Sequence, residues 1–90
     1  MSDTTKESLL EFPCEFPIKA IGKHSEDLDA LVFSLVRKHV AELSEGSVRT
    51  RPSRNGNYAG ITVTFTATSQ AQLDAIYTDL SSCEQITMVL

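Results

Sequence analysis

The sequence predicts an α+β protein, a two-layer sandwich in which two helices cover one face of a four-stranded antiparallel sheet. Alternating apolar residues mark strands on both sides of an Asn55-Gly56 turn. Apolar residues at three- and four-residue steps mark two helices. The expected order is strand, helix, strand, strand, helix, strand. The length of 90 residues and the hydrophobic content of 41% fit a single domain with one core.

The start of the chain is expected to lie outside the domain. Residues 1–8 are polar, charged and without periodicity, which predicts a disordered tail. Residues 9–13, Leu-Leu-Glu-Phe-Pro, are mostly apolar, so we expect a short arm that folds back onto the body. The domain is therefore assigned to residues 9–90.

The first strand is predicted over residues 15–22, where apolar side chains alternate. Ile18 and Ala20 are expected to face the core, and Lys19 and Ile21 the opposite face.

The first helix is predicted to begin after Ser25, a favourable N-cap, to run for about 18 residues and to end at residues 44–46. We expect His39, near its C-terminal end, to be a half-buried structural residue; a metal ligand or general base is the alternative. The predicted apolar stripe consists of Leu28, Leu31, Val32, Leu35, Val36, His39 and Leu43.

The hairpin at the centre of the chain determines the register of the sheet. Asn55-Gly56 is typical of a two-residue type I′ turn, in which both central residues have positive φ. Pro52 has no N–H, so the strand over residues 48–53 is expected at an edge and the strand over 59–67 in the interior. The turn pairs Val48 with Val63, Thr50 with Ile61 and Pro52 with Ala59 on the inner face, and Arg49 with Thr62, Arg51 with Gly60 and Ser53 with Tyr58 on the outer face.

The second helix and the last strand follow the hairpin. Ser69 and Gln72 predict a capping box at the start of the helix. Residues 85–90 predict the last strand, with Ile86, Met88 and Leu90 on one face and Thr87 and Val89 on the other. The apolar stripe of the helix is Leu73, Ile76, Tyr77 and Leu80.

These elements predict a ferredoxin-like βαββαβ arrangement with the strand order 4-1-3-2. Both helices then cover one face, and no helix remains for the other. The uncovered face is expected to carry Lys19, Ile21, Arg49, Arg51, Tyr58, Thr62, Thr64, Thr66, Thr87 and Val89.

Composition excludes several classes of function. The net charge of −4 and the pI near 5.0 argue against nucleic acid as a partner. No apolar run is long enough for a membrane span and no signal segment opens the chain, so we expect a cytoplasmic protein without a membrane partner. Cys14 and Cys83 fit no zinc or CxxC spacing and are expected to be free thiols, with a disulfide or redox switch as the alternative.

No residues form a recognisable catalytic or metal-binding motif, so we expect no enzymatic activity, no metal and no cofactor. The candidate ligand-binding residues are Lys19, Arg49, Arg51 and Tyr58 on the uncovered face, because the planar donor fork of arginine suits a carboxylate or phosphate. The alternative is that the arginines only protect an edge strand against unwanted pairing.

Several short segments resemble the YbeD-like family of small bacterial proteins. The segments are Leu9-Leu10-Glu11-Phe12-Pro13, Lys19 with Gly22, Arg37 or Lys38 before His39, Pro52-Ser53 followed by Gly56-Asn57-Tyr58, and Met88-Val89-Leu90. The resemblance covers about residue 8 to the end. It implies a ferredoxin-like fold close to the ACT regulatory domain, a cytoplasmic bacterial protein and a lipoate-related regulatory role. Relatives of this type often carry Ser in place of Gly60 and a basic residue in place of Thr87.

Two functions remain open from the sequence. The first is a regulatory or ligand-binding module that holds a small molecule, or a second copy of itself, on the uncovered face. The second is an adaptor that binds another protein through that face, an edge strand or the arm over residues 9–13.

Overall fold

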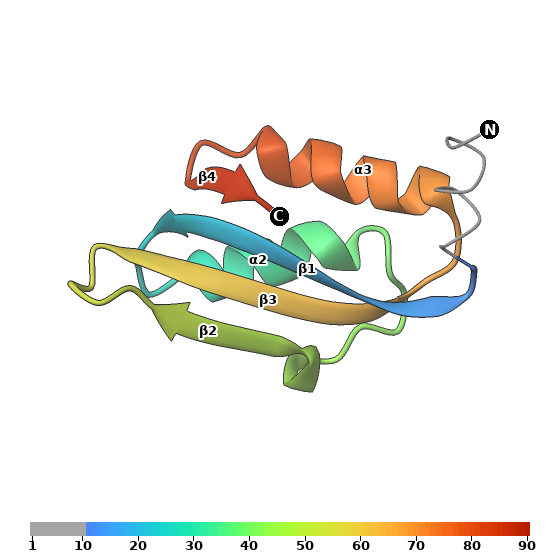
Figure 1. Ribbon diagram of the computed structural model, residues 1–90, viewed down its shortest axis with the longest axis horizontal. Helices are drawn as coiled ribbons and strands as arrows, with labels where there is room; N and C mark the ends of the chain where they lie inside the picture. The colour runs from blue at the N-terminus through green and yellow to red at the C-terminus, as the bar shows by residue number, and fades with distance from the viewer. Residues whose placement is uncertain (1–10) are drawn as a thin grey trace.

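A computed structural model describes residues 11–90, apart from the side chain of Glu45. The elements follow the predicted order (Figure 1), and they are β1 (Cys14–Lys23), α2 (Leu28–Arg37), the 3₁₀ turn η1 (Glu45–Ser47), β2 (Val48–Pro52), β3 (Tyr58–Ala67), α3 (Gln70–Ser81) and β4 (Ile86–Val89). The predicted tail over residues 1–8 and the first two residues of the arm lie outside the described residues. Phe12, from the same arm, packs half-buried against the core.

The sheet has the strand order β2-β3-β1-β4, which confirms the prediction. All neighbouring strands are antiparallel. Both helices lie on the same side of the sheet (Figure 1). Pro52 therefore stands on an edge strand, where its missing N–H costs no ladder hydrogen bond.

The register of the β2–β3 hairpin is confirmed, but the predicted turn type is wrong. Arg49 pairs with Thr62 and Arg51 with Gly60. Gly56 is the only described residue with positive φ, at 79°, so the two positive φ values of a type I′ turn are absent.

The turn is instead a four-residue loop held by backbone and side-chain hydrogen bonds. The Gly56 N–H donates to the Ser53 carbonyl at 3.0 Å. The Asn55 side-chain oxygen accepts from Ser53 Oγ at 3.0 Å and from the Asn57 N–H at 3.2 Å. With these hydrogen bonds the loop closes with only one residue, Gly56, in the left-handed conformation. Glycine adopts this conformation at little cost.

The first helix is shorter than predicted. Asp27, not Ser25, occupies the N-cap position of α2, and the helix ends at Arg37. After Arg37 the chain continues in tighter turns, in which the N–H of Val40 donates to the carbonyl of Arg37 and that of Leu43 to Val40. Val40 and Leu43 still reach the core, so these turns satisfy the apolar spacing that predicted a longer helix.

The second helix begins as predicted. Ser69 Oγ accepts a hydrogen bond from the Gln72 N–H at 3.1 Å. The Gln72 side chain does not return to Ser69 but accepts from the Thr68 N–H at 2.8 Å. Its amide also donates to the His39 carbonyl at 2.8 Å, which ties α3 to the chain beyond α2.

A polar contact joins the two helical segments. His39 Nε2 lies 2.7 Å from Asp79 Oδ2, and Lys38 Nζ lies 3.5 Å from the same oxygen. The hydrogen bond from His39, with a smaller contribution from Lys38, holds the pKa of Asp79 below its usual range. The structure therefore supports the structural interpretation of His39.

The last strand contains a change of register that the alternation did not predict. Ala20 pairs with Val89 and Ile21 with Met88, but the next residue of β1, Gly22, pairs with Ile86. Thr87 is the extra residue of this β-bulge. The prediction that Val89 lies on the outer face is therefore wrong: Val89 packs against the core, and Met88 lies on the outer face instead.

The core fills the space between the helices and the inner face of the sheet, and no polar side chain among the described residues is buried there. The buried set is Ile18, Ala20, Leu28, Val32, Val36, Val40, Leu43, Ala59, Ile61, Val63, Phe65, Ala67, Leu73, Ile76, Leu80 and Ile86.

Candidate ligand-binding face

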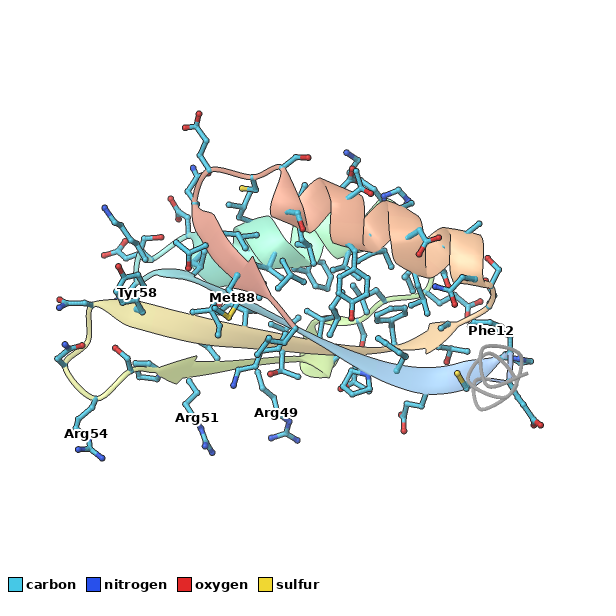
Figure 2. The ribbon with its side chains drawn as sticks, turned by 45° about the horizontal axis from the view of Figure 1, so that its top comes forward. Phe12, Arg49, Arg51, Arg54, Tyr58 and Met88 are labelled. Atoms are coloured by element: carbon cyan, nitrogen blue, oxygen red, sulfur yellow. The ribbon has the colours of Figure 1, made fainter. Side chains whose placement is uncertain are left out.

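The outer face of the sheet carries polar and basic side chains, and neither α2 nor α3 covers it (Figure 1). Figure 2 shows Arg49, Arg51 and Arg54 extending from β2 and the hairpin loop away from the helices. Strand pairing aligns the outer-face residues in two rows that cross the four strands. The first row is Arg49, Thr62, Lys19 and Leu90, and the second is Arg51, Gly60, Ile21 and Met88.

Lys19 lies across the bare backbone of Gly60. A Cβ atom at position 60 would stand 2.9 Å from Lys19 Cε, closer than side chains normally pack, and 3.8 Å from Nζ. The absence of a side chain on Gly60 therefore lets the lysine stem cross β3. This position brings the ammonium group toward β2, where Arg51 stands beside Gly60.

A shallow cavity of about 220 Å³ lies at this point of the outer face. It brings together three of the four predicted site residues, Lys19, Arg51 and Tyr58. The fourth, Arg49, is exposed one row away and does not line the cavity. The rest of the lining is Ile21, Pro52, Ser53, Ala59 and Gly60.

The chemistry of this cavity suits an anion. Among the described residues its lining contains two cations, Lys19 and Arg51, and no carboxylate. Arg51 presents several N–H donors in one plane, Lys19 a mobile charge, and the half-exposed Tyr58 a phenolic O–H. Together they can bind a carboxylate or phosphate while Ile21 contacts an apolar part of the same molecule.

Sequence reasoning missed two residues of this face. Met88 and Leu90 are 54% and 58% exposed, next to Ile21 and Lys19 on β1. The predicted alternation assumed a regular strand over residues 85–90 and so placed both residues in the core. No feature of the sequence marks the bulge at Thr87 that reverses this. The outer face therefore changes from basic at the β2 edge to apolar at the β4 edge.

A larger cavity, of about 460 Å³, lies elsewhere and has a different character. Its lining includes Glu15 and Glu42 and no basic residue. These carboxylates oppose anion binding, so volume alone does not select the site.

Other candidate chemistry finds little support in residues 11–90. Within that range no three His, Cys, Asp or Glu side chains come close enough to hold a metal ion. Cys14 and Cys83 are both free and half-buried. No helix described by the structure is long and apolar enough to cross a membrane.

The fold is shared with a solved structure. The solution structure of protein HP0495 from H. pylori superimposes with a TM-score of 0.70, covering 90% of this chain and 85% of that chain. The two sequences are only 12% identical, so this similarity concerns the fold alone.

Sequence similarity to known proteins extends over nearly the whole chain. A UPF0250 protein of Paraburkholderia phytofirmans is 45% identical over 87 residues, covering 97% of this chain and 98% of the relative. A UPF0250 protein of Chromobacterium violaceum is 42% identical over 90 residues, covering 100% of each. The model of a family described as protein of unknown function (DUF493) matches residues 7–90. The chain therefore belongs to the DUF493 or UPF0250 family of small bacterial proteins, as the resemblance to YbeD-like proteins predicted.

Proposed function

We propose that this protein is a non-enzymatic regulatory module that binds a small anionic molecule in the cavity between Lys19, Arg51 and Tyr58. The observation that carries the proposal is the convergence of two cations and a phenol over the bare backbone of Gly60. Among the described residues no carboxylate lines the cavity, so none there competes with a ligand for these two cations.

The ligand class follows from the neighbours of the cavity. A carboxylate or phosphate would bind at Lys19 and Arg51, and an apolar tail would run over Ile21 toward Met88. Amino acids and lipoyl compounds, which join a carboxylate to an apolar chain, are the first ligands to test. The lipoate-related role implied by the YbeD-like resemblance supports this choice.

The cellular setting is part of the same proposal. Two half-buried free thiols in one chain suit a reducing compartment, and we place the protein in the cytoplasm. A second copy of the chain is the other occupant that the open face would admit.

Titration of the labelled protein with these ligands, followed by amide chemical-shift mapping, tests the proposal. Shifts are expected around Lys19, Gly60 and Tyr58. Lys19→Gln should weaken binding about fivefold or more, because it removes a charge-assisted hydrogen bond. Lys23→Gln, on the same strand but outside the cavity lining, should leave binding unchanged.

Two results would count against this function. The first is a spectrum that moves with none of the ligands while sedimentation shows a monomer. The second is equal weakening by Lys19→Gln and Lys23→Gln, which would reveal attraction to charge in general and not a site.

A second candidate function is that of an adaptor, and the observation that favours it is the exposed edge of β2. Strand β2 is the outermost strand on its side of the sheet. Among the described residues, the backbone hydrogen bonds outside helices and strands do not involve Val48, Thr50 or Pro52.

A further inference from the structure

The free edge of β2 offers backbone groups in a known pattern. The Ser53 N–H donates to the Tyr58 carbonyl at 2.7 Å, so Ser53 is on the β3-facing side of the alternation. Antiparallel pairing alternates along a strand, so Arg49 and Arg51 also bond toward β3. The N–H and C=O of Val48 and Thr50 and the C=O of Pro52 therefore point away from the sheet.

The side chains of this edge oppose pairing with a second copy of the chain. A two-fold axis at Thr50 would place Arg49 of one copy opposite Arg51 of the other, twice in the same interface. Like charges directly opposite each other destabilise a strand pair. The same two arginines attract a strand that carries carboxylates at the opposing positions.

On its inner side, the β2 edge borders a cavity. A cavity of about 390 Å³ separates α2 from β2, lined by Asp29, Ala30, Phe33, Val48 and Thr50. Phe33 and Val48 are only partly buried there. An added strand would direct every second side chain into this cavity, where an apolar side chain would cover both residues.

We propose that the β2 edge binds an extended acidic peptide segment of a partner protein by antiparallel strand addition. The segment would alternate acidic and apolar residues. Its carboxylates lie opposite Arg51 and Arg49 on the outer face, in the closely spaced pairs of the ladder. Its apolar residues lie opposite Thr50 and Val48 and fill the cavity beside Phe33.

This inference rests on the adaptor function, and most of its residues lie outside the small-molecule site. The two sites share Arg51, but Arg49 and Thr50 stand on the β2 edge outside the outer cavity, and Lys19 and Tyr58 line that cavity and are not part of the edge. Variants at these four positions therefore distinguish failure of one function from failure of the other.

The test uses the full-length protein and two capped peptides, Thr-Glu-Phe-Glu-Val-Thr and Thr-Lys-Phe-Lys-Val-Thr, with binding followed by amide chemical shifts. The acidic peptide should shift Val48, Thr50 and Phe33, and should bind about tenfold or more tightly than the basic one. The double variant Arg49→Glu/Arg51→Glu should reverse this preference.

A matched pair of substitutions at Thr50 tests the backbone contact. Thr50→Pro removes an N–H that faces away from β3, so the sheet should persist while peptide affinity falls about tenfold or more. Thr50→Val keeps the N–H and should bind like the unaltered protein. Should Thr50→Pro fail to fold, the charge-reversal pair still decides the question.

Three results would overturn the proposal. Equal binding of the two peptides would remove the charge argument, and equal affinity of Thr50→Pro and Thr50→Val would remove the strand argument. A dimer that dissociates on Thr50→Pro substitution would assign the edge to a second copy of the chain.

Discussion

The two faces of the sheet are built by alternate residues of the same strands, yet they obey different constraints. On β3, Ile61 and Val63 are fully buried under the helices, whereas the alternating residues Thr62 and Thr64 reach solvent. The inner face has to fit α2 and α3 without gaps, so packing determines its residues. The outer face packs against neither helix, so strand pairing is the main constraint on its residues and its side chains remain available for binding.

The largest expected effect is a truncation on the inner face. Ile61→Ala should lower the free energy of unfolding by about 2–5 kcal/mol, because it removes buried methylene groups and leaves a cavity. Thr62→Ala, the neighbouring residue on the outer face, should change it by less than about 0.5 kcal/mol. Urea unfolding of both variants measures the difference, and similar losses would erase the distinction between the faces.

A substitution at Gly22 tests the packing of the inner face where β1 comes close to the start of β4. A Cβ atom at this position would clash with the carbonyl oxygen of Gln85, a backbone atom that cannot rotate away. Gly22→Ala should therefore cost about 1–3 kcal/mol.

Gly46→Ala is the matched control, because its Cβ would meet only Ser44 Oγ at 3.9 Å. Unfolding curves of the two variants should differ clearly in midpoint. Equal midpoints would mean that β4 moves to make room for a side chain at position 22.

Substitutions at the N-cap of α3 test how much this cap contributes to holding the helix over the inner face. Ser69→Ala removes the acceptor for the Gln72 N–H and should cost about 1 kcal/mol. Ser69→Asp supplies a new acceptor and should recover most of that loss. Thermal unfolding compares the variants; no recovery with Asp would assign the loss to something other than the cap.

The smallest expected effect concerns the contact between the helical segments and depends on pH. Because the pKa of Asp79 is lower in the folded state, its contribution is present above the usual value of 3.8 and is lost as the pH falls through the lowered value. The stability difference between the protein and Asp79→Asn should therefore shrink from about pH 7 to about pH 3. A double-mutant cycle with His39→Gln should show coupling at the higher pH only.

A pH-independent difference would contradict this account. It would mean that the hydrogen bond to His39, and not the charge on Asp79, accounts for whatever the substitution removes.

Local patterns in the sequence predicted the sheet well. Pro52 and the alternation around Asn55-Gly56 predicted the β2–β3 register and the edge strand, and the order of helices and strands predicted the strand order. Three of the four candidate site residues meet in one cavity, because residues of one parity on paired strands necessarily share a face.

The errors arose where distant contacts override a local pattern. The chain beyond Arg37 keeps helical spacing of apolar residues but turns more tightly, and Gln72, far along the chain, bonds the His39 carbonyl. The bulge at Thr87 exchanges the expected positions of Met88 and Val89. Asp79 was missed as the partner of His39 because a half-buried helical carboxylate has no sequence feature that specifies such a contact.

Gly60 has one more consequence. Lys19 crosses the strand where that residue ends at its Cα, so a larger side chain there would displace the flexible lysine stem from its present path. The depth of the cationic pocket is thus controlled by a single solvent-side position. Under the proposed binding function, exchange of that residue alone would alter ligand preference among related chains with little effect on fold stability.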